Sequence, residues 1–126
     1  MNDIPDAKHG IKEITMKEIK AIIQPFMFDK VAEALAEIPG FPGMTVSDIR
    51  GFGRQMGGRG EGAEAPFAFV PKVKIEVVVP DDLVEAVVTT ISEAARTGRV
   101  GDGKIFILPV LRARRIRTGH EDEDAI

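Results

Sequence analysis

The segment Thr97–Lys104 combines residue types that can hold phosphate groups. Its three glycines leave backbone N–H groups accessible to an anion, and Arg99 and Lys104 add positive charge. Such amides can form an anion-binding nest, to which a lysine contributes a point charge. The spacing differs from that of a Walker A loop. The simpler interpretation is a glycine-rich turn that only lets the chain reverse direction.

A dense basic group follows in residues 112–119. Four of the six residues from Arg112 to Arg117 are arginines, in a chain whose net charge is −3. The planar guanidinium group suits bidentate recognition of phosphate. A solvated tail is the alternative interpretation, although we expect Leu111 and Ile116 to hold this segment against the fold.

Two further polar groups flank a long glycine-rich segment, residues 53–70. Arg54 and Gln55 stand where it begins, and Lys72 follows its end. If the segment closes on itself, the Gln55 amide and the Lys72 ammonium could together hold a metal-bound carboxylate ligand. Such long segments are uncommon inside a compact domain and are often functional. A passive linker with a flexible root is the alternative.

Hydrophobic periodicity indicates two strand–helix–strand units in tandem. In each unit, apolar runs with β-branched residues predict strands, and apolar residues at helical spacing predict the helix between them. We expect Asp81 or Asp82 to cap the second helix at its N-terminus and Gly98 to end it. The predicted elements are strand Met16–Ile23, helix Phe28–Ile38, strand Met44–Ile49, strand Val73–Val79, a helix from Asp81 or Asp82 to Ala95, and strand Lys104–Val110.

This order predicts an α+β fold, a ferredoxin-like βαββαβ sandwich. Its four-stranded antiparallel sheet carries two helices on one face, because right-handed crossovers place both helices on the same side. Val77–Val79 and Ile105–Leu108 indicate strands that are apolar on both faces. Apolar residues on the uncovered face would form an unusually large exposed patch, so we expect self-association through the sheets.

Composition excludes several classes of function. The 126 residues suffice for one domain, and a pI of about 5.4 disfavours nucleic-acid binding. The absence of cysteine rules out disulfides and thiolate metal sites. No apolar run is long enough for membrane insertion, and Met1–Thr15 does not resemble a signal peptide, so we expect a cytoplasmic protein. His9 and His120 lie in terminal segments, without a catalytic triad or an HExxH motif.

Together these features resemble the PII family of nitrogen-regulatory signal transduction proteins. The resemblance covers Met16–Ile126 and leaves residues 1–15 as an N-terminal extension. Each motif is short, but their joint order and spacing are specific. The motifs are Gly43–Val46, Gly51–Gln55, Pro71–Glu76, Val78–Asp82, Ala95–Gly98, Gly101–Phe106, Arg115–Gly119 and Asp124–Ile126.

The resemblance implies a homotrimer that binds ATP or ADP in three clefts between subunits. In each cleft the glycine-rich turn would hold the phosphates, and Thr45 and Val78 would line the adenine side. With ATP, Gln55 would bind Mg²⁺, and 2-oxoglutarate would bind to Gln55, Lys72 and the backbone of Gly101. The implied nucleotide-binding residues are Thr45, Gly53, Arg54, Gln55, Val78, Gly101, Asp102, Gly103 and Lys104, with Arg115 and Arg117 reaching in from the neighbouring subunit.

The family's long T-loop, here residues 53–70, changes shape with ligand and inserts into target proteins. This chain departs from the family there, because it has no tyrosine, and no serine or threonine lies between Gly53 and Pro71. Uridylylation, adenylylation or phosphorylation of a loop hydroxyl is therefore chemically excluded. The departure leaves open whether the family's usual partners apply: ammonium channels, the adenylyltransferase of glutamine synthetase and the arginine-pathway kinase. A paralogue that regulates another transporter or target, without 2-oxoglutarate sensing, is the alternative.

We therefore predict a signalling protein of nitrogen and carbon metabolism that binds effectors and regulates a partner, and that is not an enzyme. Ligands would shift the loop toward the conformation that fits the partner. A slow ATP hydrolase is an alternative, but no general base is evident. An RNA-binding module is another alternative. Such a module on this fold normally needs aromatic side chains on its central strands to stack bases, and Phe106 is the main candidate for that role here.

Overall fold

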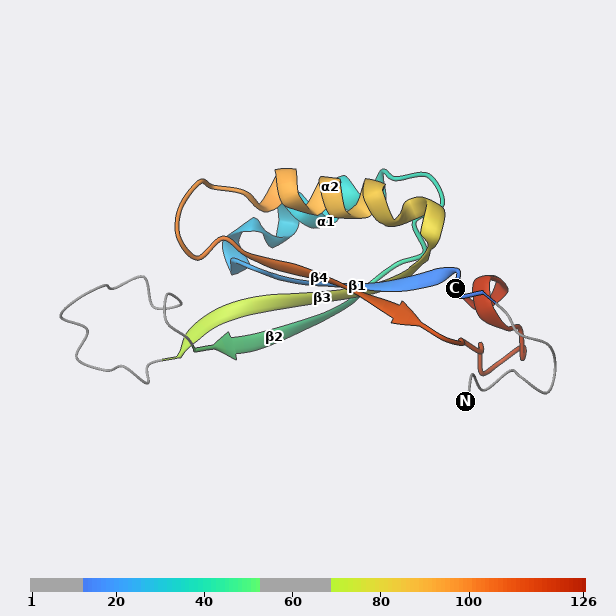
Figure 1. Cartoon of the computed structure of the whole chain (residues 1–126). Coiled ribbons are helices and arrows are strands. Elements are labelled where there is room, and N and C mark those ends of the chain that lie inside the picture. Colours follow the sequence, from blue (N-terminus) through green and yellow to red (C-terminus); the bar gives the residue numbers. More distant parts are fainter. Residues whose placement is uncertain (1–12, 53–68) are drawn as a thin grey trace.

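The computed structural model describes residues 13–52 and 69–126, arranged as Figure 1 shows. The strands are β1 (Met16–Ile23), β2 (Thr45–Gly51), β3 (Val70–Pro80) and β4 (Gly103–Val110). The helices are α1 (Phe28–Ala36) and α2 (Val84–Ala95), with short 3-10 helices at Pro25–Met27, Asp81–Leu83 and Asp122–Ala125. Within these two ranges, no helix has the length and apolar character needed to cross a membrane.

The four strands form one antiparallel sheet in the order β2-β3-β1-β4. Helix α1 connects β1 to β2, and α2 connects β3 to β4, so each helix joins two strands that are not neighbours. Both helices lie on the same face of the sheet (Figure 1), as right-handed crossovers require. This arrangement confirms the predicted α+β, ferredoxin-like βαββαβ architecture.

The core lies between the helices and the sheet. It is built by side chains that alternate between the two faces of the central strands β1 and β3. Side chains two residues apart point to the same face of a strand, so the odd-numbered positions of β1 and β3 meet the helices. Each large aliphatic side chain buried in this way contributes about 1.5–3 kcal/mol. The buried core residues are Ile19, Ala21, Ile23, Val31, Leu35, Val73, Ile75, Val77, Val79, Val87, Ile91, Ala94 and Ala95.

The uncovered face of the two central strands is polar. Lys20 of β1 lies opposite Glu76 of β3, and Glu76 forms an ion pair with Lys74 at 3.8 Å. The prediction that the strands are apolar on both faces therefore holds only in part for β3. Val77 and Val79 belong to the core and Val78 lies on the other face, but Lys74 and Glu76 make the rest of that face polar.

Exposed apolar side chains concentrate instead on β4. Phe106, Ile107 and Leu108 remain 46%, 48% and 36% exposed. This strand has only one neighbour in the sheet, β1, so its other edge is unpaired. An apolar edge strand favours association with another chain.

The second helix ends at Ala95 as predicted, but both of its predicted caps are wrong. Neither Asp81 nor Asp82 caps α2, because a short 3-10 helix precedes it and no side-chain hydrogen bond caps either element. Asp81 instead forms an ion pair with Lys17, with 2.6 Å between Oδ1 and Nζ. Gly98 lies beyond the helix end, because Arg96 is already extended, and it adopts a φ of 87° in the following turn.

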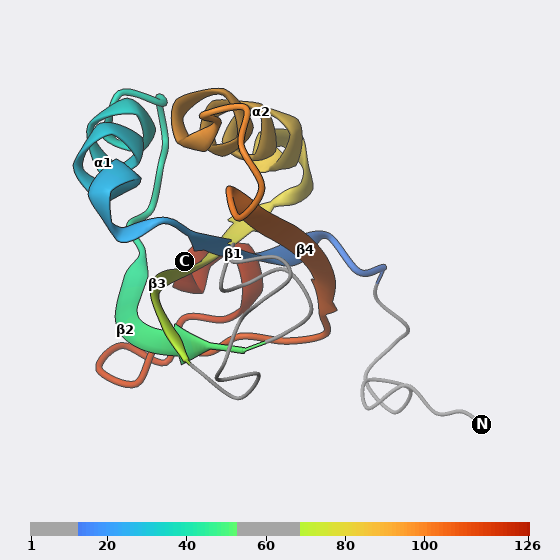
Figure 2. The same cartoon turned by 90° about the vertical axis from the view of Figure 1, so that its left-hand side faces the viewer.

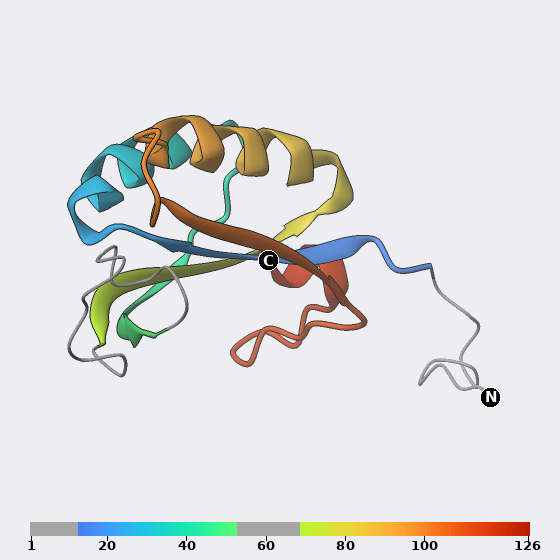
Figure 3. The same ribbon diagram turned by 60° about the vertical axis from the view of Figure 1, so that its left-hand side comes forward.

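After β4 the chain crosses beneath the uncovered face of the sheet (Figure 2 and Figure 3). It runs from the end of β4 toward the β2 side and then returns, so the C-terminal 3-10 helix lies under the sheet (Figure 2). Leu111 and Ile116 are 54% and 98% exposed. The prediction that these two side chains hold the segment against the fold is therefore wrong.

The close approach of β4 to β1 gives a test of this architecture. Gly103 pairs with Ile23, and a Cβ at this position would lie 1.8 Å from the carbonyl oxygen of Ile22. Its φ of 121° also disfavours any other residue. We expect Gly103→Ala to lower the free energy of unfolding by more than about 2 kcal/mol, measured by urea unfolding at one protein concentration.

Gly119→Ala is the matched control. Gly119 also has a positive φ, 78°, but a Cβ there would have no neighbour within 4 Å. Its replacement should cost only the backbone strain, about 1 kcal/mol. Equal losses in the two variants would contradict the close β1–β4 approach.

Candidate functional site

The turn between α2 and β4 lies at the same end of the sheet as the end of β1 (Figure 1). Its three glycines, Gly98, Gly101 and Gly103, all adopt positive φ, between 87° and 121°. Residues with a side chain rarely adopt this conformation. The glycines that the sequence places here are therefore needed to shape the turn itself.

Asp102 lies within this turn and bonds to it. Its Oδ2 accepts hydrogen bonds from the backbone N–H groups of Thr97 and Gly98, at 2.7 and 2.9 Å, and its Oδ1 accepts one from the Thr97 hydroxyl. The Thr97 hydroxyl, followed by these backbone donors, lowers the pKa of the Asp102 carboxyl. The carboxylate is thus ionised and already satisfied by its own turn.

Lys72, near the start of β3, reaches the same turn. It is 2% exposed, and its Nζ donates a hydrogen bond to the Gly101 carbonyl oxygen at 2.6 Å. Burial lowers the pKa of Lys72, and the Asp102 carboxylate partly opposes that shift. Two residues implied to bind 2-oxoglutarate, Lys72 and Gly101, are therefore in direct contact.

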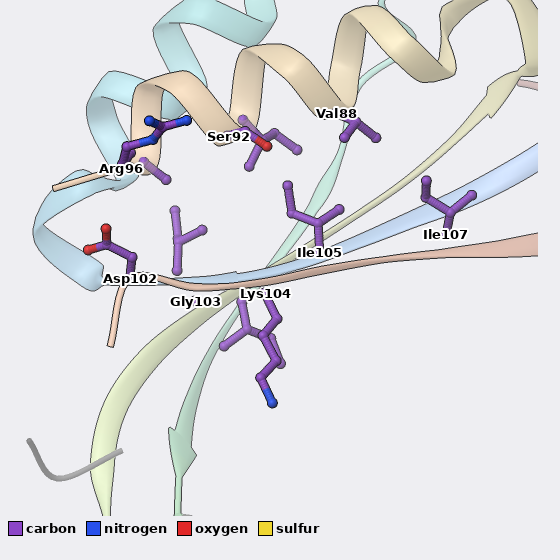
Figure 4. A pocket seen from close by; sticks show the side chains of 12 residues that line it. Val88, Ser92, Arg96, Asp102, Gly103, Lys104, Ile105 and Ile107 are labelled. Carbon is purple, nitrogen blue, oxygen red and sulfur yellow. The ribbon is translucent and has the colours of Figure 1, made fainter. Parts of the chain in front are cut away.

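Asp102 and Lys104 lie on opposite sides of β4 (Figure 4). The Asp102 carboxylate lies on the side of α2, at one end of a mainly apolar cavity of about 320 Å³. Ile105 and Ile107 point from β4 toward α2, whereas the Lys104 side chain points to the other side (Figure 4). The Lys104 side chain thus lies on the uncovered face of the sheet.

A second cavity, of about 590 Å³, lies beside β2 and β3. Thr45 and Val78, both implied to line the adenine side, share it with the C-terminal residue Ile126. Glu18 and Glu76 also line it, and Glu76 pairs with Thr45 across the two strands. The structure therefore brings both predicted adenine-side residues into one hollow.

These two groups of residues lie apart in the sheet. Thr45 belongs to the outer strand β2 and Lys104 to the outer strand β4, which are three strand spacings, or about 14 Å, apart. Lys72 and Val78 both belong to β3 but lie toward its opposite ends, about 20 Å apart along the strand. We refer to Lys72 with Gly101–Lys104 as the turn half-site, and to Thr45 with Val78 as the β2 half-site. A single chain keeps the two half-sites apart.

The basic C-terminal segment forms a tight hairpin. The Arg115 N–H donates to the His120 carbonyl oxygen at 2.9 Å, and the Gly119 N–H donates to the Arg115 carbonyl oxygen at 2.8 Å. Behind this tip, the Asp122 N–H donates to the Ala113 carbonyl oxygen at 2.8 Å. These backbone hydrogen bonds hold residues 115–120 together as the tip of the hairpin.

The four arginines of the hairpin divide into two pairs. Arg112 and Arg114 both form ion pairs with Glu121. Within residues 13–52 and 69–126, neither Arg115 nor Arg117 has an ion-pair partner. The two guanidinium groups implied to reach a neighbouring subunit are thus the two that this part of the chain leaves unneutralised.

The two ends of the long glycine-rich segment meet through aromatic side chains. The rings of Phe52 and Phe69 lie 5.6 Å apart between centroids, and the guanidinium carbon of Arg50 lies 5.4 Å from the Phe69 centroid. Ring and cation–π contacts of this kind are favourable. The implied ligands Gly53, Arg54 and Gln55, and most of the T-loop, lie outside the described residues.

Two side chains at these sites, Gln24 and Glu121, are not among the residues predicted from the sequence. The amide nitrogen of Gln24 lies 3.1 Å from where a Cβ on Gly101 would stand, so Gln24 borders the turn half-site. No local pattern links these two distant positions. Glu121 could have been found, since an acidic residue close after a run of arginines is a natural ion-pair partner.

Comparison with known proteins places this architecture in one family. The family described as Nitrogen regulatory protein P-II matches residues 16–120. Nitrogen regulatory protein P-II 1 of Escherichia coli K12 is 58% identical over 113 residues, which are 88% of this chain and 100% of that protein. The P-II protein of Haemophilus influenzae Rd is 56% identical over the same shares.

A solved structure agrees. The crystal structure of Arabidopsis thaliana PII bound to citrate superimposes with a TM-score of 0.75 and 44% sequence identity, covering 90% of this chain and 94% of that one. Both the sequence and the fold are thus shared with named regulatory proteins over nearly the whole chain. The chain belongs to the P-II family of nitrogen regulatory proteins.

Proposed function

We propose that this chain is a signalling protein that binds ATP or ADP between two copies of itself and regulates a partner through residues 53–70. The observation that carries this proposal is the separation of the turn half-site from the β2 half-site within one chain. A neighbouring copy would bring its β2 half-site to the turn half-site, and a homotrimer would close three such clefts.

Two exposed surfaces support assembly. The edge strand β4 exposes Phe106, Ile107 and Leu108, and the hairpin tip exposes Ile116 almost completely. Exposed apolar side chains of this size usually mark an interface. An assembly that covers them would also carry Arg115 and Arg117 to a neighbour's ligand.

The chemistry of each cleft follows from its two halves. Lys104 and the amides of the turn would hold phosphate oxygens, and Arg115 and Arg117 of the neighbouring copy would add bidentate contacts. Thr45 and Val78 would line the adenine. The described ranges contain no cluster of three His, Cys, Asp or Glu side chains that could hold a metal. A Mg²⁺ bound with ATP would therefore depend on oxygens of the nucleotide, the effector and Gln55.

Lys72 is the proposed effector-binding group. Among the described residues it is the one buried charged side chain, and a carboxylate ligand would supply a negative charge in direct contact with it, which the Gly101 carbonyl does not. The Arabidopsis PII relative was solved with citrate, a carboxylate ligand. We propose 2-oxoglutarate, bound together with Mg-ATP, as the ligand of Lys72, the Gly101 backbone and Gln55.

The proposed output is a shift among conformations of residues 53–70 that favours or disfavours a partner protein. This segment offers no hydroxyl for modification, so ligands alone would control it. The same feature favours the second candidate, a paralogue whose partner is not an ammonium channel and whose loop no longer senses 2-oxoglutarate.

Nucleotide binding tests the proposed function directly. We expect calorimetric titration to detect ADP and ATP binding, and Lys104→Ala to weaken it by about tenfold or more, because a charge-assisted contact to phosphate is lost. Lys30→Ala is the control, since Lys30 is exposed on α1 and the binding of nucleotide should not change. Absence of nucleotide binding by the unaltered protein would contradict the proposal.

Effector binding distinguishes the two candidates. If Lys72 holds a carboxylate, Lys72→Met should abolish binding of 2-oxoglutarate in the presence of Mg-ATP, while Lys30→Met should not. The ammonium form binds the anion, so affinity should be full below the Lys72 pKa and fall as pH rises through it, at a pH below the ordinary lysine value. Nucleotide binding without any 2-oxoglutarate binding would favour the paralogue.

A further inference from the structure

We propose that Asp102 is a positioning residue, the internal anion that holds the phosphate-binding turn in shape, and not itself a ligand of the nucleotide. The proposal rests on the proposed function where nucleotide affinity is concerned. It replaces the role that the family resemblance implies for Asp102, and it is argued from the bonds of the turn.

Both carboxylate oxygens of Asp102 are occupied by the turn. Oδ2 accepts from two consecutive backbone N–H groups, those of Thr97 and Gly98, and Oδ1 accepts from the Thr97 hydroxyl. The Thr97 oxygen in turn accepts a hydrogen bond from the Arg99 N–H at 3.2 Å. The Thr97 and Gly98 amides, but not the later amides of the turn, are thus bonded to an anion that the chain itself supplies.

The direction of Asp102 points to the same role. Its carboxylate lies on the side of α2, whereas Lys104 projects to the other side of the strand (Figure 4). An anionic ligand held by Lys104 would therefore not face the Asp102 carboxylate. A carboxylate that shared the ligand's side would instead repel phosphate.

The position of Asp102 also links the two proposed ligands of the turn half-site, which are the nucleotide and the 2-oxoglutarate bound by Lys72. It follows Gly101, whose carbonyl oxygen accepts the Lys72 hydrogen bond, and it precedes Gly103, whose close packing on Ile22 starts β4. The hydrogen bonds from Thr97 and Gly98 to the Asp102 carboxylate close the loop from Thr97 to Asp102 into a ring, and this ring fixes the position of the Gly101 carbonyl. Loss of the ring would disturb the phosphate contacts and the Lys72 contact together.

One ammonium group lies near Asp102. The Lys72 ammonium is near enough to interact electrostatically with it, and Arg96 lines the cavity at whose end the carboxylate lies. The Thr97 hydroxyl and the backbone donors lower the pKa of the Asp102 carboxyl, which keeps it ionised under physiological conditions. The turn would hold its shape until pH falls through that lowered value.

Three variants separate positioning from direct binding. Asp102→Ala removes all three bonds and should weaken ADP binding by about tenfold. Asp102→Asn keeps an oxygen for the two N–H groups and an amide nitrogen for the Thr97 oxygen, so it should restore much of the affinity. Thr97→Val removes only the hydroxyl bond and should weaken ADP binding to an intermediate extent. Asp82→Ala, an exposed change remote from the turn, should have no effect.

Each other pattern overturns the proposal. Tighter ADP binding by both Asp102 variants would show that the carboxylate repels the nucleotide. Equal weakening by Ala and Asn, with Thr97→Val unchanged, would show that the charged group contacts the ligand directly. Thermal unfolding of each variant should match the unaltered protein, because the bonds of this exposed turn are local.

A ligand-free measurement keeps this inference separate from the proposed function. Amide hydrogen exchange by NMR, without nucleotide, should show that the Thr97 and Gly98 N–H groups exchange about tenfold faster in Asp102→Ala. The Asp102→Asn variant should exchange more slowly than Asp102→Ala. If the unaltered protein binds no nucleotide, the proposed function fails while this result still decides the role of Asp102. Unchanged exchange in Asp102→Ala would refute that role.

Discussion

The order of strands in the sheet is the constraint on which the rest of this protein depends. Because β1 and β3 occupy the centre, Thr45 of the β2 half-site and Lys104 of the turn half-site lie on opposite outer strands. The same order leaves β4 as an apolar edge strand and lets the C-terminal hairpin cross beneath the sheet (Figure 2). In this account a ligand site is completed only by assembly, so ligand binding and subunit contact belong to one equilibrium.

In the proposed function, a single buried ammonium group would connect ligand and output. Lys72 contacts the Gly101 carbonyl, and β3 leads from Lys72 back to Phe69, where the aromatic contact with Phe52 joins the two ends of the long segment. A ligand that shifts the turn therefore acts on the root of that segment through contacts already present. Such a short chain of contacts suits a protein in which ligand binding would change the populations of the conformations of residues 53–70.

Much of this could be predicted from sequence, for identifiable physical reasons. Strands and helices followed from hydrophobic periodicity, because burial against one face imposes it. The run Val77–Val79 is apolar on both faces, as predicted, but Lys74 and Glu76 make the rest of the uncovered face of β3 polar. Asp81 was expected to cap a helix, but it pairs with Lys17, 64 residues away. The Lys72–Gly101 contact spans 29 residues and depends on tertiary approach, which no local motif encodes.

The most direct test of the central claim is half-site complementation. Lys104→Ala damages the turn half-site and Arg117→Ala damages the hairpin that would serve a neighbouring copy, so each variant alone should bind ADP weakly. Unfolding an equal mixture and refolding it together should restore tight ADP binding in about one cleft in four, as random assembly of a cyclic oligomer requires. Calorimetry measures the recovered stoichiometry. A mixture that binds no more tightly than the separate variants would contradict a site shared between chains.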